Sequence, residues 1–327
     1  MKTINREIKP KKLKDNFFKQ DPPFNGKTIV SFSQYNLFNK CPLSWKIKYI
    51  DKIKLFQESI ELVFGTAMHD TLEEYIHVYY EQTIKAADEM DIEDVFSKKM
   101  VDEYEKRYQK AGEHFSTEEE FYNYLADGIN ILRYFKKKKS LVLSKKNVQL
   151  INTEHNILIP ALNDNPNVVM KLLLDVVLYN YKTKTLIIYD FKTSKKGWGD
   201  YKKKDKLSTD QLLLYKKYFS EKYNFPVDDI EITYVILKRK IYEQSEFVQR
   251  RIQMFEPANG KVSINKAMKR MEEFVSHGFL PNGKHNRDAS YPAHAGPKNY
   301  NCTFCPFKDK PEHCNPKTRL RNNYLDI

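Results

Sequence analysis

Two apolar runs in the second half of the chain each end in a carboxylate, and this pattern limits how the chain can fold. Residues 186–189 are typical of a buried strand, and Asp190, Phe191 and Lys192 follow them. Side chains two residues apart share one face of a strand, so Asp190 and Lys192 place a carboxylate beside an ammonium group. The preceding apolar run, 172–174, leads into Asp175. If the two strands pair, Asp175 and Asp190 come within metal-bridging distance.

Two predicted helices complete the pattern. The segment 64–82 has apolar residues at helical spacing, and it carries His69 with Glu73 one turn later on the same face. A later helix, 207–223, carries Gln211 and Tyr215 one turn apart. Taken alone, Asp-x-Lys is usually a strand-end ion pair, and a helical histidine is usually bonded to a neighbour such as Glu73. The order of the four stretches is what makes them specific.

The rest of the chain alternates between predicted helices and strands. Further helices are expected at 34–39, 44–49, 94–108, 117–135 and 264–277, and strands at 148–159, 168–179, 185–191, 230–238 and 246–255. We expect an α/β fold, a mixed sheet flanked by helices. Its segments are a flexible basic arm at 1–25, an N-terminal segment at 26–62, an active-site helix with a helical insertion at 63–146, a core at 147–280 and a cysteine-bearing segment at 281–327.

The charge balance favours a polyanionic partner. Lys and Arg number 56 against 43 Asp and Glu, a net charge of +13 that suits nucleic acid. A generally lysine-rich proteome would produce the same surplus. No stretch approaches the roughly 18–20 apolar residues of a membrane span, and residues 1–20 lack the apolar region of an export signal. The expected location is the cytoplasm, or the host cytoplasm if a phage encodes the chain.

Together these residues resemble the PD-(D/E)xK nuclease superfamily, in its RecB/AddB-like branch, over about residues 30–315. The resemblance implies a restriction-endonuclease-like core and a DNA nuclease that depends on Mg²⁺ or Mn²⁺. One position departs from the family pattern. The family often has Gly-x-x-Asp before the second-strand acid, whereas Leu172 precedes Asp175 here, which can change how closely the substrate backbone approaches.

The resemblance also implies roles for single residues. Metal binding would involve His69, Asp175, Asp190 and the carbonyl of Phe191. Lys192 would orient the attacking water or help to deprotonate it, and would stabilise the charge that builds up on the phosphoryl group. Gln211 and Tyr215 would contact the DNA backbone and brace the site. Glu154 would have a supporting role, and Glu73 would either bind the metal or orient His69.

Four cysteines form a second constellation: Cys41, Cys302, Cys305 and Cys314. In a chain with no export signal, clustered thiols indicate metal ligands before disulfides. In AddB-type nucleases and CRISPR-associated RecB-like exonucleases, one cysteine before the core and three after it bind a 4Fe–4S cluster. The same layout here favours iron–sulfur, with Zn²⁺ as the alternative, because thiolates suit both. Either group would join the two ends of the chain.

The segment between the catalytic strand and the Gln211 helix is expected to bind DNA. Its candidate residues are Lys195, Lys196, Trp198, Tyr201, Lys202, Lys203 and Lys204. Lysines neutralise phosphates, and aromatic rings stack on unpaired bases. The ordinary alternative is a solvated loop.

The expected function is therefore that of an exonuclease in recombination, repair or DNA-end processing. Its partner would be DNA that has a free end or is single-stranded. Two alternatives remain: a nuclease that processes CRISPR spacers, and an iron–sulfur DNA-binding subunit of a helicase–nuclease complex that does not cut. The intact Asp175, Asp190 and Lys192 argue against a subunit that does not cut. The chain has no Gly-x-x-x-x-Gly-Lys-Ser/Thr phosphate loop, so it contains no helicase motor.

Overall fold

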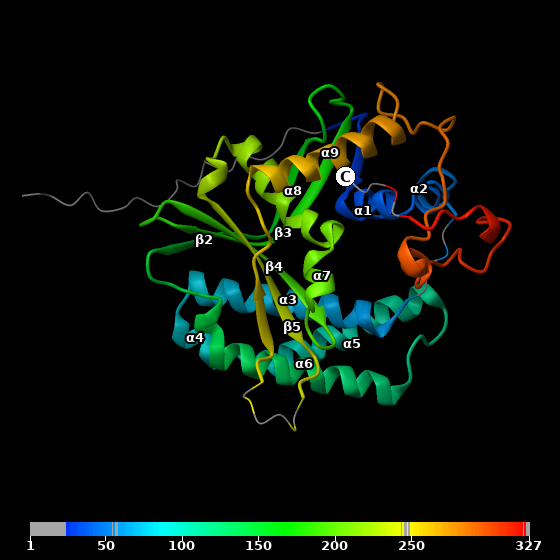
Figure 1. Cartoon of the computed structure of the whole chain (residues 1–327). Helices are drawn as coiled ribbons and strands as arrows, with labels where there is room; N and C mark the ends of the chain where they lie inside the picture. The colour runs from blue at the N-terminus through cyan, green and yellow to red at the C-terminus, as the bar shows by residue number, and fades with distance from the viewer. Residues whose placement is uncertain are drawn as a thin grey trace, which may run out of the picture.

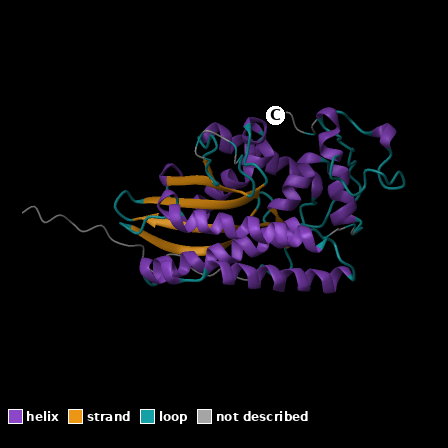
Figure 2. Cartoon of the chain, turned by 90° about the horizontal axis from the view of Figure 1, so that it is seen from below, coloured by secondary structure: helices purple, strands orange, loops and turns teal. Residues whose placement is uncertain are grey.

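The computed structural model describes residues 24–53, 55, 58–242, 244, 247, 249–322 and 324. The arm expected at 1–25 lies outside the described residues, apart from its last two. Within the described part, the strands lie between two groups of helices (Figures 1 and 2). No helix found there combines the length and the apolar character that crossing a membrane requires.

Six strands of the described residues form one mixed sheet. They are β1 (Thr28–Ser31), β2 (Val148–Pro160), β3 (Val168–Asn180), β4 (Thr185–Ser194), β5 (Ile230–Lys238) and β6 (Ile252–Phe255). The order along the sheet is β1-β3-β4-β5-β6, with β2 paired to the other edge of β3. β3 runs antiparallel to β2 and β4, and β4 runs parallel to β5. The prediction of a mixed α/β sheet is confirmed.

The centre of the sheet contains a gap. β1 and β4 share one edge of β3: β1 pairs with residues 168–171, and β4 pairs with 176–180. Residues 172–175 therefore have no strand partner on that edge. Asp175 is the last residue of the gap, directly before β4 begins to pair.

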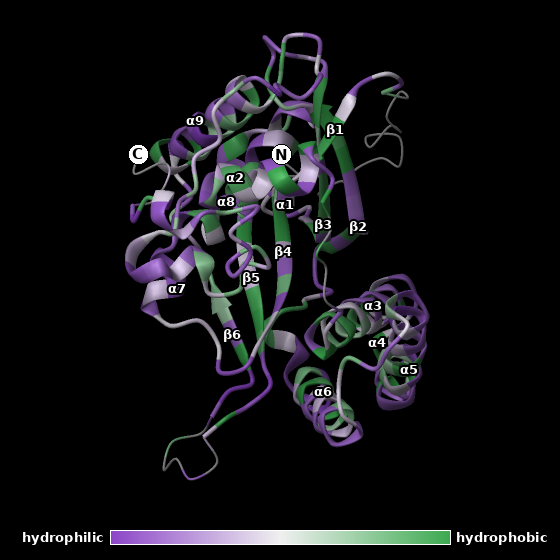
Figure 3. Ribbon diagram, turned by 90° about the vertical axis from the view of Figure 1, so that its right-hand side faces the viewer, coloured by the Kyte–Doolittle hydropathy of each residue, from purple (hydrophilic) through white to green (hydrophobic). Residues whose placement is uncertain are grey.

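Helices cover both faces of the sheet (Figure 3). One group contains α1 (Phe32–Lys40), α2 (Pro42–Trp45), α8 (Lys206–Tyr223) and α9 (Lys261–Gly278). The other contains α3 (Ile60–Glu81), α4 (Ile84–Glu89), α5 (Ile92–Ala111) and α6 (Glu118–Lys138). Each group packs its apolar side chains onto its own face of the sheet and forms a separate hydrophobic cluster. The second group lies mostly within 63–146, the segment expected to hold the active-site helix and a helical insertion, although α3 begins earlier, at Ile60.

Six segments differ from the predicted elements. β1 and α4 are not anticipated, and the segment expected to be a loop before Gln211 contains a short helix, α7 (Asp200–Lys204). The helix expected at 44–49 is instead α2 followed by a π-helix, Lys46–Ile50. Part of the strand expected at 246–255 lies outside the described residues, and β6 occupies its end. The expected loop at 281–300 ends in a 3-10 helix, Pro297–Cys302.

A buried ion pair joins the helices of the first group. Arg270 of α9 donates through Nε to Asp210 Oδ2 of α8 at 2.7 Å, and the Tyr35 hydroxyl of α1 donates to the same oxygen at 2.6 Å. Both charged side chains are almost completely buried. A buried charge pair is costly to break, because the remaining partner keeps an uncompensated charge. This network therefore holds α8, which carries Gln211 and Tyr215, in position against the sheet.

Replacing the arginine of this network should destabilise the fold. We expect Arg270→Ala to lower the free energy of unfolding by about 3–5 kcal/mol, because Asp210 would be left buried without its partner. Chemical denaturation followed by circular dichroism measures the change. Arg133→Ala is the matched control, since it removes an exposed arginine–carboxylate pair with Glu93 on the helical insertion. A loss of stability no larger for Arg270→Ala than for Arg133→Ala would contradict the role given to this network.

Candidate active site

Asp175 occupies the gap in the sheet and links it to the next strand. Its Oδ2 accepts the backbone N–H of Phe191 at 2.7 Å, so the carboxylate is turned along the sheet toward β4. The Nδ1 atom of His69, on α3, lies 3.4 Å from the same oxygen. Three of the predicted metal-binding residues, far apart in sequence, thus meet at one point.

The strand pleat is interrupted at Asp175. Leu172 and Leu174 pack under α8 and α9, yet Val176 and Leu178 pack under α3. In a regular strand, alternate residues stay on one face, so the alternation breaks between Leu174 and Val176. This break leaves the Asp175 carboxylate directed toward β4 instead of into either hydrophobic cluster.

Glu154 lies opposite this break. The residues on either side of Glu154 and Asp175 are paired across β2 and β3, which places the two acids opposite each other. Glu154 has a φ of 45°, a left-handed backbone that a residue with a side chain seldom adopts within a strand. Backbone strain of this kind clusters at functional sites. Burial raises the pKa of Glu154, and the charges of Glu73 and Asp70 raise it further.

Asp190 and Lys192 lie side by side in the second half of β4, which continues to Ser194 instead of ending at residue 191 as the sequence predicts. Lys192 Nζ is 2.6 Å from Asp190 Oδ2, and Asp190 is 0% exposed. The other oxygen of this carboxylate, Oδ1, has no hydrogen-bond partner among the described residues. A buried carboxylate oxygen without a partner is costly unless a ligand satisfies it. Oδ1 is therefore suited to binding a cation.

The site holds its groups in the charge states that metal binding uses. Burial raises the pKa of Asp175 and of Asp190 to about 6, although the charge of Lys192 opposes the shift. Burial acts to lower the pKa of Lys192, but the charges of Asp190 and Asp175 outweigh it and leave this pKa raised. Burial and the charge of Lys192 lower the pKa of His69. His69 is thus neutral near pH 7, which is the form that binds metals.

The donor set suits a hard divalent cation. It combines two carboxylates, a neutral imidazole and a backbone carbonyl, and Mg²⁺ and Mn²⁺ favour such oxygen-rich sites. Within the described part of the chain, no three His, Cys, Asp or Glu side chains already converge as the ligands of one ion. In this arrangement Asp190 is paired with Lys192, while Asp175 faces His69 and the Phe191 backbone.

Glu73 contacts a residue that the sequence does not single out. The hydroxyl of Thr153, on β2, donates to Glu73 Oε1, and His77 Nε2 lies 3.9 Å from the same oxygen. The charge of Glu73 nevertheless adds to the raised pKa of Asp175. In the sequence, Thr153 could be linked to the site only through its position directly before Glu154.

Gln211 and Tyr215 brace the gap from the α8 side. The Tyr215 hydroxyl donates to the carbonyl oxygen of Leu173 at 2.6 Å, and Gln211 Nε2 donates to the Tyr215 oxygen at 2.7 Å. Leu173 lies in the part of β3 that has no strand partner on this edge, so the tyrosine takes the place of a missing strand. Tyr215 is buried, so its side chain contacts β3 and is not open to solvent. The expected contact of this pair with DNA stays a prediction.

The two aromatic residues before α8 differ in exposure: Trp198 is half-buried and Tyr201 is exposed. The Trp198 ring packs 4.7 Å from the Tyr234 ring, and its backbone N–H donates to Gln253 Oε1 at 2.8 Å. The lysines expected to bind DNA range from exposed to half-buried: Lys195, Lys196 and Lys204 are exposed, while Lys202 and Lys203 are half-buried.

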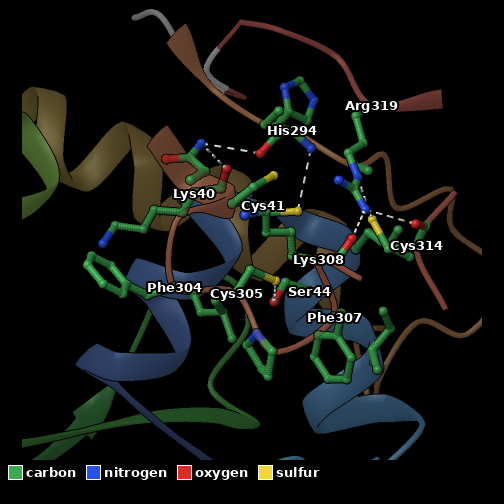
Figure 4. Close-up of a pocket in the computed structure, with 18 of the residues that line it drawn as sticks. Lys40, Cys41, Ser44, His294, Phe304, Cys305, Phe307, Lys308, Cys314 and Arg319 are labelled. Atoms are coloured by element: carbon green, nitrogen blue, oxygen red, sulfur yellow. Dashed lines mark hydrogen bonds between the residues drawn. The ribbon is translucent and has the colours of Figure 1, made fainter. Parts of the chain in front are cut away.

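All four cysteines line one cavity of about 240 Å³ (Figure 4). Cys41 lies between α1 and α2, and the others lie in the C-terminal segment. The backbone N–H of His294 donates to Cys41 Sγ at 3.4 Å, and Arg319 Nε donates to Cys314 Sγ at 3.2 Å. The thiols are free, with no disulfide among them. Burial raises the pKa of Cys41 and of Cys302.

Comparison with known proteins places the chain in a family. A search of the curated proteins found no match. The family model of the PD-(D/E)XK nuclease superfamily matches residues 29–310. This range includes the sheet except Thr28, all of the helices that flank it, and three of the four cysteines. From this match and the geometry above, we conclude that the chain belongs to the PD-(D/E)XK nuclease superfamily.

Proposed function

We propose that this protein is a Mg²⁺- or Mn²⁺-dependent deoxyribonuclease, an exonuclease that acts in recombination, repair or DNA-end processing. The observation that carries the proposal is the fully buried Asp190, with one carboxylate oxygen unpaired and Lys192 beside the other. Family membership implies phosphodiester hydrolysis. The exonuclease activity and its biological setting are part of the proposal.

The chain's own residues would divide the work between holding an ion and handling charge. His69, Asp175, Asp190 and the Phe191 carbonyl would hold the metal, which supplies an activated water and stabilises negative charge on the phosphoryl oxygens. Lys192, kept protonated by its neighbouring carboxylates, would donate to the water or to a phosphoryl oxygen. Tyr215 would keep the unpaired part of β3, and with it Asp175, in position.

The same proposal assigns a 4Fe–4S cluster to the cysteines. Thiolates bind both iron–sulfur clusters and zinc. The four thiols surround one cavity, which is the arrangement that either group needs. The donors from His294 and Arg319 are of the kind that stabilises charge on cluster sulfurs. Zinc is the alternative to the cluster. A CRISPR spacer-processing nuclease and a DNA-binding subunit that does not cut are the alternatives to the exonuclease.

Loss of either Asp190 or Lys192, in the second half of β4, should abolish cleavage. We expect Asp190→Asn, and separately Lys192→Ala, to lower the cleavage rate by at least about 100-fold, because each removes a metal ligand or a stabiliser of the transition state. The assay uses protein purified without oxygen and end-labelled single- and double-stranded DNA with Mg²⁺ or Mn²⁺. Asp164→Asn, an exposed acid in the β2–β3 turn, is the matched control. Cleavage near the wild-type rate by either variant would show that the proposed site is wrong.

Removing the Tyr215 hydroxyl tests the bracing role. We expect Tyr215→Phe to lower the free energy of unfolding by about 1–3 kcal/mol, because the Leu173 carbonyl loses its partner in a region with no neighbouring strand. Cleavage should slow while the Kd for DNA stays the same. A raised Kd with an unchanged cleavage rate would instead indicate that the hydroxyl contacts DNA.

Replacing a cysteine should remove the bound group and loosen the ends of the chain. Cys41→Ala or Cys302→Ala should lose the brown colour and visible absorbance of the anaerobically purified protein and unfold at lower temperature. The control is His313→Ala, which changes a residue next to Cys314. It should keep the visible absorbance and the unfolding temperature of the wild-type protein. Metal analysis that finds stoichiometric zinc and no iron in the wild-type protein would refute the iron–sulfur assignment and leave the joining role intact.

A further inference from the structure

Three aromatic rings are exposed between the nuclease core and the cysteine segment. Tyr201 of α7 is 67% exposed, Tyr300 is 48% exposed and Phe304 is 94% exposed. The rings of Tyr201 and Tyr300 lie 5.5 Å apart and nearly perpendicular, so α7 meets the C-terminal segment at this point. Large rings left in contact with water at one place often mark a binding surface.

The chain holds this arrangement in place through bonds beside the rings. Asn301, next to Tyr300, donates through Nδ2 to the Lys40 carbonyl at 3.0 Å. Phe304 lies between Cys302 and Cys305 in sequence, and both Phe304 and Lys40 line the cysteine cavity, on the same side of it in Figure 4. The rings therefore project from a surface that the two ends of the chain build together.

Lysines lie beside the rings and lead toward the active site. Lys202 follows Tyr201 on α7, and its Nζ lies 5.6 Å from the centre of the Trp198 ring. The Trp198 ring packs 4.7 Å from the Tyr234 ring, and Lys192 Nζ lies 6.0 Å from the centre of that same Tyr234 ring. These contacts link α7 to the active site, and Lys40, at the end of α1, supplies a second ammonium group beside the rings.

We propose that Tyr201, Tyr300 and Phe304 form a stacking ledge for the unpaired bases of a single-stranded DNA end that leads into the active site. Lys40 and Lys202 would contact its phosphates. This inference rests on the proposed nuclease function and names the form of DNA that the site accepts. Exposed rings beside ammonium groups suit single strands, because unpaired bases offer faces for stacking while the backbone carries the negative charge. A duplex hides its base faces.

Stacking and charge make different contributions, so two kinds of variant separate them. We expect Tyr201→Ala, Tyr300→Ala and Phe304→Ala each to weaken binding of a fluorescent oligothymidylate by about 5- to 150-fold, as expected for one lost base–aromatic stack. The dependence of binding on salt should stay the same. Lys40→Ala and Lys202→Ala should instead flatten that dependence by roughly 0.7 in the log–log slope per lost phosphate contact.

The experiment measures the Kd by fluorescence anisotropy without divalent metal, so that no DNA is cut. A blunt duplex of the same length is the second ligand, and its affinity should not change in the ring variants. Tyr122→Ala removes a ring of similar exposure, 58%, from the helical insertion and should leave both affinities unchanged. Tyr300→Phe should bind as wild type does, since it keeps the stacking face. Unchanged melting temperature and visible absorbance confirm that each variant is folded with its cysteine site intact.

The outcomes distinguish failure of the stacking ledge from failure of the proposed nuclease function. If the ring variants bind oligothymidylate as tightly as wild type does, the ledge is wrong, even if wild type cuts DNA. The ledge is equally wrong if the rings prove to bind a protein instead of DNA. If the ring variants lose single-strand affinity but wild type cuts no DNA with Mg²⁺ or Mn²⁺, the ledge stands and the proposed nuclease function fails.

Discussion

The hydrogen bond from the Phe191 backbone to the Asp175 carboxylate organises the rest of the molecule. It spans the place where β3 has lost β1 as a neighbour and has not yet gained β4. An acidic side chain in this position satisfies a backbone donor and still presents charge to His69. The candidate active site thus lies at an irregularity in the sheet, and surrounding elements compensate for the strand that is missing there.

That compensation comes from both faces of the sheet. On one face, Tyr215 supplies the donor for the Leu173 carbonyl, and α8 is held in place by the buried pair of Asp210 and Arg270. On the other, α3 packs on the sheet and presents His69. The two raised carboxylate pKa values follow from the same architecture, because burial that rigidifies the gap also deprives its acids of water. A divalent cation would relieve this cost, so stability and metal binding are linked at one site.

The sequence predicts the strands and long helices well, because their apolar periodicity survives in the folded state. Short patterns also single out Asp175, Asp190, Lys192 and His69, and the structure places His69 beside Asp175 and Lys192 beside Asp190. Their roles as metal ligands and in catalysis stay predictions. The sequence does not reveal β1, a strand of four residues that pairs with only part of β3. Nor does it reveal the broken pleat, because no glycine marks the left-handed backbone at Glu154. Trp198 illustrates a different limit: its contact with Tyr234 and partial burial depend on tertiary packing, which composition does not reveal, and its stacking on DNA stays a prediction.

The cysteine segment positions Tyr300 against Tyr201 of α7. Tyr300 and Tyr201 are separated by about a hundred residues of chain, and they meet where the C-terminal segment lies beside α1. Backbone bonds already secure part of this arrangement, since Leu43 donates to the Pro292 carbonyl at 3.2 Å. A group bound by all four thiols would fix the remainder. The same α7 that meets Tyr300 leads directly into α8, which carries Tyr215. A continuous set of contacts therefore runs from the cysteine segment through α7 and α8 to the unpaired segment of β3 that contains Asp175.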